Sequence, residues 1–92
     1  MAQSTILAAG VDGSTSSDVV LAAGAVATIG LFVSSGTLQP GTRALVYVDT
    51  PGADNIEAEL DHIRKETQVV GPATYRVQRL SAPAAFGVFS ET

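Results

Sequence analysis

Residue types that support acid–base or metal chemistry are few, and the richest stretch is 57–66. His62 is the only histidine, the one side chain that ordinarily titrates near neutral pH, and it stands beside Asp61 and close to Glu66. A metal site or an acid–base pair would need a second histidine or a cysteine at ligand spacing, and the chain has neither. We therefore interpret His62 as an exposed structural histidine.

Three carboxylates, Glu57, Glu59 and Asp61, alternate along the same stretch. Paired carboxylates hydrolyse glycosidic bonds when they face each other across the substrate. Carboxylates that follow one another on a single strand face are typical of a solvated sheet surface instead, and this is the interpretation we favour.

Hard oxygen ligands for calcium occur around a Pro-Gly loop, at Asp49, Asp54 and Asn55. Their spacing does not match an EF-hand, and Asp and Asn are ordinary turn-forming residues. The serines lie outside any Gly-x-Ser-x-Gly elbow, and the glycine-rich stretches lack the lysine of a phosphate loop. The sequence therefore predicts a protein that is not an enzyme, with no catalytic, cofactor-binding or metal residue and no cofactor.

Composition points to contact with other chains. The 92 residues suffice for one domain, 46% of them are hydrophobic and only 15% are charged, and the mean hydropathy is +0.29. Part of that apolar inventory is expected to be buried against a partner, as in a homo-oligomer. A net charge of -4 argues against nucleic-acid binding. The apolar run 19–33 is too short and too interrupted by glycine for a membrane span.

Short alternating segments bounded by turn residues predict an all-β fold, an antiparallel sandwich of about seven strands that is immunoglobulin-like or jelly-roll-like. The segment 56–66 fits two structures. Its alternation of apolar and acidic residues favours a strand, whereas Ile56, Leu60 and Ile63 stand at helical spacing after two candidate capping residues, Asp54 and Asn55. We favour the strand. The expected strands are 19–21, 25–33, 43–49, 56–66, 67–70, 73–79 and 85–90.

The first residues look separate from this body. Residues 1–17 read as an N-terminal arm and Ser/Thr/Gly linker, and 18–92 as the sandwich domain. The arm is either a disordered terminus or a segment whose Ile6, Leu7 and Val11 dock on a neighbouring subunit.

Two aromatic features complete the pattern. Tyr75 follows a Gly-Pro corner, as in the strand entry of immunoglobulin-like sandwiches, where the hydroxyl bonds to nearby backbone; we expect Tyr75 in the core rather than stacked on a ligand. Phe86 and Phe89 have odd spacing and so lie on opposite sides of the last strand. One of these two phenylalanines is therefore a candidate interface residue.

Five stretches, 18–25, 29–32, 49–53, 71–79 and 87–91, together resemble small virion structural proteins of tailed bacteriophages. The resemblance covers 18–92 and implies a capsid decoration, or cement, protein on the outer surface of the head, which binds major capsid subunits, commonly as a trimer with an extended arm. It supplies no functional residue. The alternative is a carbohydrate- or receptor-binding module of a head fibre or tail component, with its site in the loops.

Overall fold

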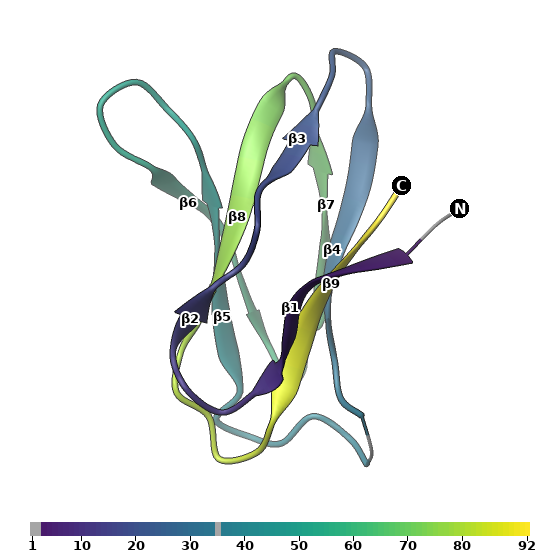
Figure 1. Ribbon diagram of the computed structural model, residues 1–92, viewed down its shortest axis with the longest axis vertical. Helices are drawn as coiled ribbons and strands as arrows, with labels where there is room; N and C mark the ends of the chain where they lie inside the picture. The colour runs from purple at the N-terminus through teal and green to yellow at the C-terminus, as the bar shows by residue number, and fades with distance from the viewer. Residues whose placement is uncertain (1–2, 35) are drawn as a thin grey trace.

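Two antiparallel sheets face each other across one apolar core in the computed structural model, which describes residues 3–34 and 36–92 (Figure 1). The all-β prediction is confirmed, and the described part of the chain has no helix that could span a membrane. The strands are β1 (Gln3–Gly10), β2 (Ser14–Thr15), β3 (Val19–Leu21), β4 (Val26–Phe32), β5 (Arg43–Val48), β6 (Asn55–Asp61), β7 (Glu66–Val70), β8 (Ala73–Arg79) and β9 (Phe86–Glu91).

The strand order is that of a jelly roll. The first sheet has the order β1-β9-β4-β7, and the second has β2-β8-β5-β6, with β3 also paired to β8. When β2 and β3 are taken as two parts of one interrupted strand, the eight strands follow jelly-roll order: consecutive strands lie in opposite sheets, except β5 and β6, which pair in the second sheet. In an immunoglobulin-like sandwich the last two strands pair within one sheet, whereas here β8 and β9 belong to opposite sheets.

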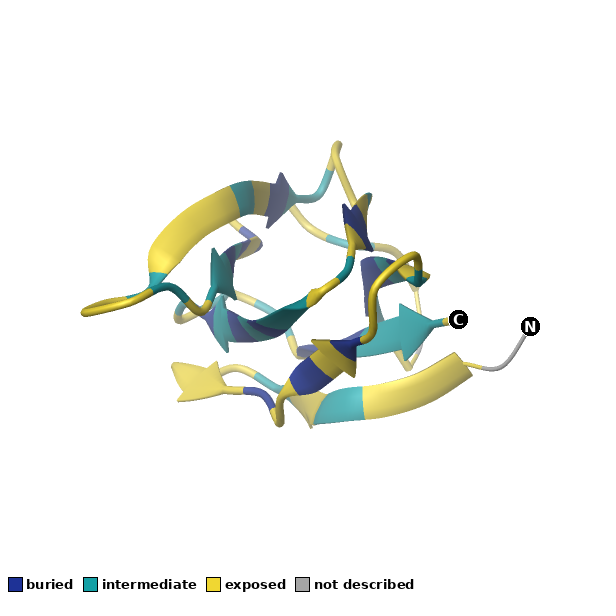
Figure 2. Cartoon of the chain, turned by 90° about the horizontal axis from the view of Figure 1, so that it is seen from above, coloured by how far each residue is buried: buried dark blue, intermediate teal, exposed yellow. Residues whose placement is uncertain are grey.

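The core forms because alternate side chains of each strand point between the sheets. Viewed from above, buried and exposed residues alternate along several strands (Figure 2). The largest fully buried side chain is Phe86. The buried hydrophobic residues are Val19, Leu21, Ala27, Ile29, Leu31, Ala44, Val46, Leu60, Val69, Tyr75, Val77, Phe86 and Val88.

The segment 56–66 is not helical, and the predicted strand is present as far as Asp61, whereas residues 62–65 form a turn. Its first part belongs to β6, which pairs with β5, and β7 begins at Glu66 after a turn. Only Leu60 of the apolar residues at helical spacing is buried, whereas Ile56 and Ile63 are exposed. A bulge opposite Val46 and Tyr47 shifts the register and places Ile56 on the outer face of the sheet.

The N-terminal residues differ from the expected arm. Residues 3–10 form β1, which pairs with β9 from Gln3↔Glu91 to Gly10↔Phe86, and residues 14–15 form β2 on β8. These two strands raise the count from about seven to nine among the described residues. Two irregularities in the β1–β9 register obscure the alternation that would have marked a strand. Residues 1 and 2 of the expected arm lie outside the described residues.

Arg79, at the end of β8, joins the two sheets. The residue is 6% exposed, and its guanidinium donates to three backbone carbonyls: Nε to Asp12 O at 2.7 Å, and Nη1 to Ala8 O at 2.7 Å and to Phe86 O at 2.9 Å. The guanidinium carbon lies 5.8 Å from the centroid of the Phe86 ring. These bonds connect β8 with β1, with β9 and with the β1–β2 connection. A Cβ at Gly10 would lie 2.7 Å from Arg79 Nη2, so glycine leaves room for the guanidinium.

The predicted role of Tyr75 is confirmed. The side chain is buried, and its hydroxyl donates a hydrogen bond of 2.7 Å to the Val70 carbonyl. Because β7 and β8 belong to different sheets, this bond ties the corner at which the chain crosses between them.

We predict that Arg79→Met lowers the free energy of unfolding by about 3 kcal/mol or more, because three inward-facing carbonyls lose their donor. Urea denaturation measures the loss. The matched control is Arg43→Met, since Arg43 is exposed and pairs only with Glu59; its cost should stay below about 1 kcal/mol. Equal costs for the two variants would contradict a structural role for Arg79.

Candidate functional site

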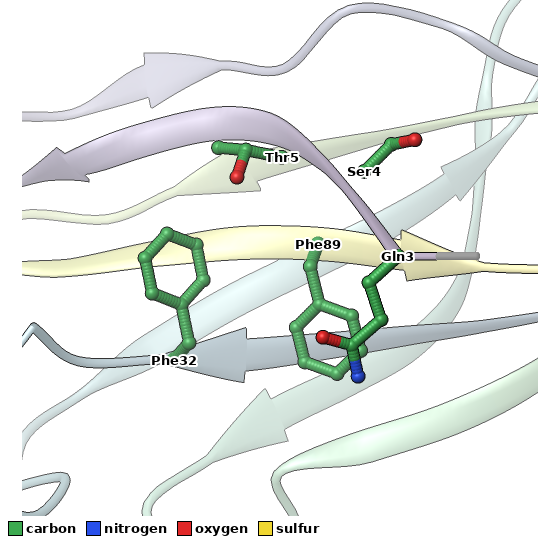
Figure 3. Close-up of a pocket in the computed structure, with 5 residues that line it drawn as sticks. All are labelled: Gln3, Ser4, Thr5, Phe32 and Phe89. Carbon is green, nitrogen blue, oxygen red and sulfur yellow. The ribbon is translucent and has the colours of Figure 1, made fainter.

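An open hollow of about 470 Å3 lies on the outer face of the first sheet. It is lined by Gln3, Ser4 and Thr5 of β1, by Phe32 of β4 and by Phe89 of β9 (Figure 3). The lining residues thus come from three adjacent strands, which include both the first and the last of the chain.

Two phenylalanine–glycine pairs make the floor of the hollow. In the β4–β9 register Gly30 stands opposite Phe89, and Phe32 stands opposite Gly87. A Cβ at Gly30 would lie 2.6 Å from the Phe89 ring, and one at Gly87 would lie 2.5 Å from the Phe32 ring. Each ring therefore covers the glycine of the opposite strand. Figure 3 shows the Phe32 side chain pointing from β4 toward β9 and the Phe89 side chain pointing from β9 toward β4.

The two phenylalanines of β9 lie on opposite faces, as their spacing predicted. Phe86 is fully buried between the sheets, so it is not available to a partner. Phe89 points outward and is half-buried in the hollow. Of these two candidate interface residues, only Phe89 is therefore accessible to a partner.

The three remaining interface candidates lie apart from the hollow. Ile6 and Leu7 of β1 are half-buried and pack against the protein's own core, because β1 is a strand of the sandwich and not a free arm. Val11 is 43% exposed in the connection between β1 and β2. These three residues are thus not brought together as one outward-facing surface.

The charged residues within the strands of the first sheet are all acidic. None of the five lining residues is charged, and within their bounds the four strands of the first sheet contain no Lys or Arg. Glu91 pairs with Gln3 and Thr28, and Glu66 pairs with Gly30, so both acids flank the hollow on the outer face. The hollow offers aromatic surface beside hydroxyl and amide groups, in a weakly negative setting. Such a set of groups binds and orients a ligand but contains no acid–base pair or nucleophile.

Two of the three carboxylates of β6, Glu59 and Asp61, have local partners. Asp61 Oδ1 accepts hydrogen bonds from the backbone N–H groups of Arg64, at 2.7 Å, and Ile63, at 2.9 Å. These bonds hold the pKa of Asp61 below its ordinary value. Glu59 forms an ion pair with Arg43, whose Nε lies 3.0 Å from Glu59 Oε2. Asp61 therefore shapes the turn that contains His62.

Asp49 and Asp54, considered above as calcium ligands but interpreted as turn residues, lie in the loop between β5 and β6, the teal hairpin that projects at the upper left of Figure 1; Asn55 is the first residue of β6. Asp54 forms an ion pair with Arg76, which also donates to Asp18 Oδ1 at 3.1 Å; these two hydrogen bonds raise the pKa of Arg76. Asn55 donates to the Thr50 hydroxyl at 3.3 Å. Across residues 3–34 and 36–92, no three His, Cys, Asp or Glu side chains gather into a metal-binding group.

The hollow was not predicted from the sequence. Gly30 was the available signal, since a glycine inside a strand marks either a bulge or a close approach. The β4–β9 register is regular at Gly30, and the group that approaches is the Phe89 ring. No family model matches this chain, and searches of curated proteins and of solved structures find no match.

We predict that the effect of Gly30→Ala on the free energy of unfolding depends on whether residue 89 is phenylalanine or alanine. Gly30→Ala destabilises the native chain because the new Cβ displaces the Phe89 ring. In the Phe89→Ala background the same change is neutral or stabilising, since alanine fits a strand better than glycine. Urea denaturation of the four proteins measures the coupling energy. An equal effect of Gly30→Ala in both backgrounds would show that the ring does not cover the glycine.

We also predict a pH-dependent contribution of Asp61. Because its folded-state pKa is lowered, the carboxylate stabilises the turn above the ordinary pKa, and this contribution is lost as the pH falls through the lowered value. Asp61→Asn keeps an acceptor that does not titrate. The melting temperatures of the native chain and the variant should differ most at neutral pH and converge in strong acid. A difference that does not change with pH would contradict this role.

Proposed function

We propose that this protein is a non-enzymatic structural protein of a tailed-bacteriophage virion, a decoration protein that binds major capsid subunits on the outer surface of the head as a homo-oligomer, by expectation a trimer. The observation that carries the proposal is an exposed, uncharged apolar surface at one end of the sandwich.

This surface, which we call the apolar end, is made by two turns that are far apart in sequence. One connects β3 to β4 and the other connects β7 to β8, and they meet where Gly71 N donates to Ala25 O at 2.8 Å. Both turns lie at the top of Figure 1. Val20, Val70 and Val26 are 73%, 59% and 48% exposed. The exposed residues of the apolar end are Val20, Ala22, Ala23, Val26, Val70 and Pro72.

Its composition suits burial against another protein. No charged residue occurs in 19–42 or in 67–75, and the centres of protein interfaces are depleted in charge. The paired charges, Arg43 with Glu59 and Arg76 with its two aspartates, belong to the second sheet or to the segments that adjoin it. Val26 and Val70 are paired neighbours on the outer face of the first sheet, whereas Val20 lies on the outer face of the second sheet, across the end of the sandwich. Exposed apolar surface on a small protein usually marks an interaction site.

The fold supports the proposal by analogy, since jelly rolls occur among viral capsid proteins and also among lectins. The mechanism is mass action: a protein that binds only the assembled shell stabilises the shell, and several copies in one oligomer raise the avidity. Among the sequence-derived interface candidates, Val11 and Phe89 remain accessible to such contacts.

A second candidate, the carbohydrate- or receptor-binding module, is favoured by the aromatic hollow. The hollow lies on strands rather than in the loops expected to form such a site. The two candidate functions are compatible, because the hollow and the apolar end share no residue.

We predict that Val70→Asp weakens binding to empty heads assembled from the phage's major capsid protein by tenfold or more, which is about 1.4 kcal/mol. The carboxylate would have to be buried at the contact without a partner. Co-sedimentation measures the occupancy, and the heat resistance of the decorated heads reports the stabilisation. The matched control is Ile56→Asp, a site equally exposed on the second sheet, which should bind like the native chain. No binding of the native chain to heads would refute the proposal; equal binding by both variants would refute the apolar end as its contact.

A further inference from the structure

We infer that the hollow on the first sheet is a binding site for the pyranose ring of a neutral saccharide. This inference rests on the second candidate function, for which it names the ligand class, and it does not depend on the decoration function, because the hollow and the apolar end share no residue.

The shape and lining of the hollow match a small-ligand site. Its volume of about 470 Å3 falls within the range of roughly 300–1,000 Å3 that is typical of ligand pockets. Such pockets combine apolar and aromatic surface with a few polar groups that orient the ligand. Phe32 and Phe89 supply the apolar surface, and the side chains of the β1 residues Gln3 and Thr5 supply the polar groups.

The two rings form a stacking surface. Each ring covers a glycine of the opposite strand, and both rings are seen broadside in Figure 3. One side of each ring therefore rests on backbone, and the other remains open toward the hollow. A pyranose ring has an apolar face of C–H groups that stacks on such a surface, while its hydroxyl groups lie around its edge.

The polar groups fit that edge. The Gln3 amide both donates and accepts hydrogen bonds, and so does the Thr5 hydroxyl. Neighbouring hydroxyls of a sugar need partners that can do both. Gln3 pairs with Glu91 and Thr5 pairs with Phe89, so both side chains lie on the face that carries the rings and meet one edge of a sugar stacked on Phe32 and Phe89. Ser4 pairs with Ser90, and its side chain points away from the rings in Figure 3.

The electrostatics select a neutral sugar. Glu66 and Glu91 flank the hollow, no lining residue is charged, and the whole chain has a net charge of -4. A carboxylated sugar would be repelled by these acids and would find no cation in the lining.

Titration of the full chain with neutral trisaccharides, namely maltotriose, cellotriose and N-acetylchitotriose, tests the inference, with sialyllactose as the anionic comparison. We expect binding of at least one neutral probe, followed by NMR, with shifts centred on residues 3–5, Phe32 and Phe89. Phe89→Ala should weaken that binding by about tenfold, equal to about 1.4 kcal/mol. Val26→Ala, an apolar truncation on the same sheet face but outside the hollow, is the matched control and should leave the affinity unchanged.

A second variant distinguishes a loss of binding from a loss of folding. Gln3→Ala removes only an exposed side chain at the start of β1, and we expect it to weaken binding several-fold with an unchanged melting temperature. No binding of any neutral trisaccharide, shifts that lie elsewhere, or tighter binding of sialyllactose would each overturn the inference. Occupancy of the heads by Gln3→Ala should equal that of the native chain, so failure of the saccharide site and failure of the decoration function are separate results.

Discussion

The structure depends on one buried cation. Arg79 lies at the end of β8 with its charge removed from solvent, and it is held by the carbonyls of Ala8, Asp12 and Phe86 and not by a carboxylate. A buried guanidinium is tolerable only when such acceptors surround it, and the acceptors in turn require the guanidinium as their donor. The first strand, the last strand and the second sheet are therefore held in one relative position. The shape of the hollow depends on these hydrogen bonds, because its polar residues belong to β1 and Phe89 belongs to β9.

Charged and uncharged residues occupy different parts of the surface. The ion pairs of Arg43 and Arg76 hold the second sheet, the β5–β6 loop and the segment before β3, whereas the turns at the apolar end carry no charge. The outer face of the first sheet has aromatic surface with flanking acids and no basic residue within its strands. The protein contact that we propose uses the uncharged end, and the saccharide site that we propose uses the hollow on the first sheet.

Local patterning predicted much of the fold. The alternation along β4, β5 and β8 marked the strands that enclose the core, and the Gly-Pro corner before Tyr75 predicted the hydroxyl–carbonyl bond that is present. The odd spacing of Phe86 and Phe89 placed them on opposite faces. The segment 3–15 was misjudged, because two register irregularities in β1 and a two-residue β2 leave no clear period to recognise.

By itself, then, the sequence determined the fold class, the inward and outward faces of most strands and the corner at Tyr75, since each follows from neighbours a few residues apart. Only the tertiary structure decided which strands lie side by side. Gly30 faces Phe89, and Gly87 faces Phe32, through a pairing of segments that are more than fifty residues apart in the printed sequence. The apolar end likewise exists because two distant turns meet at Gly71 and Ala25. Register and contact between distant segments are set by the packing of the whole sandwich, and local periodicity does not specify them.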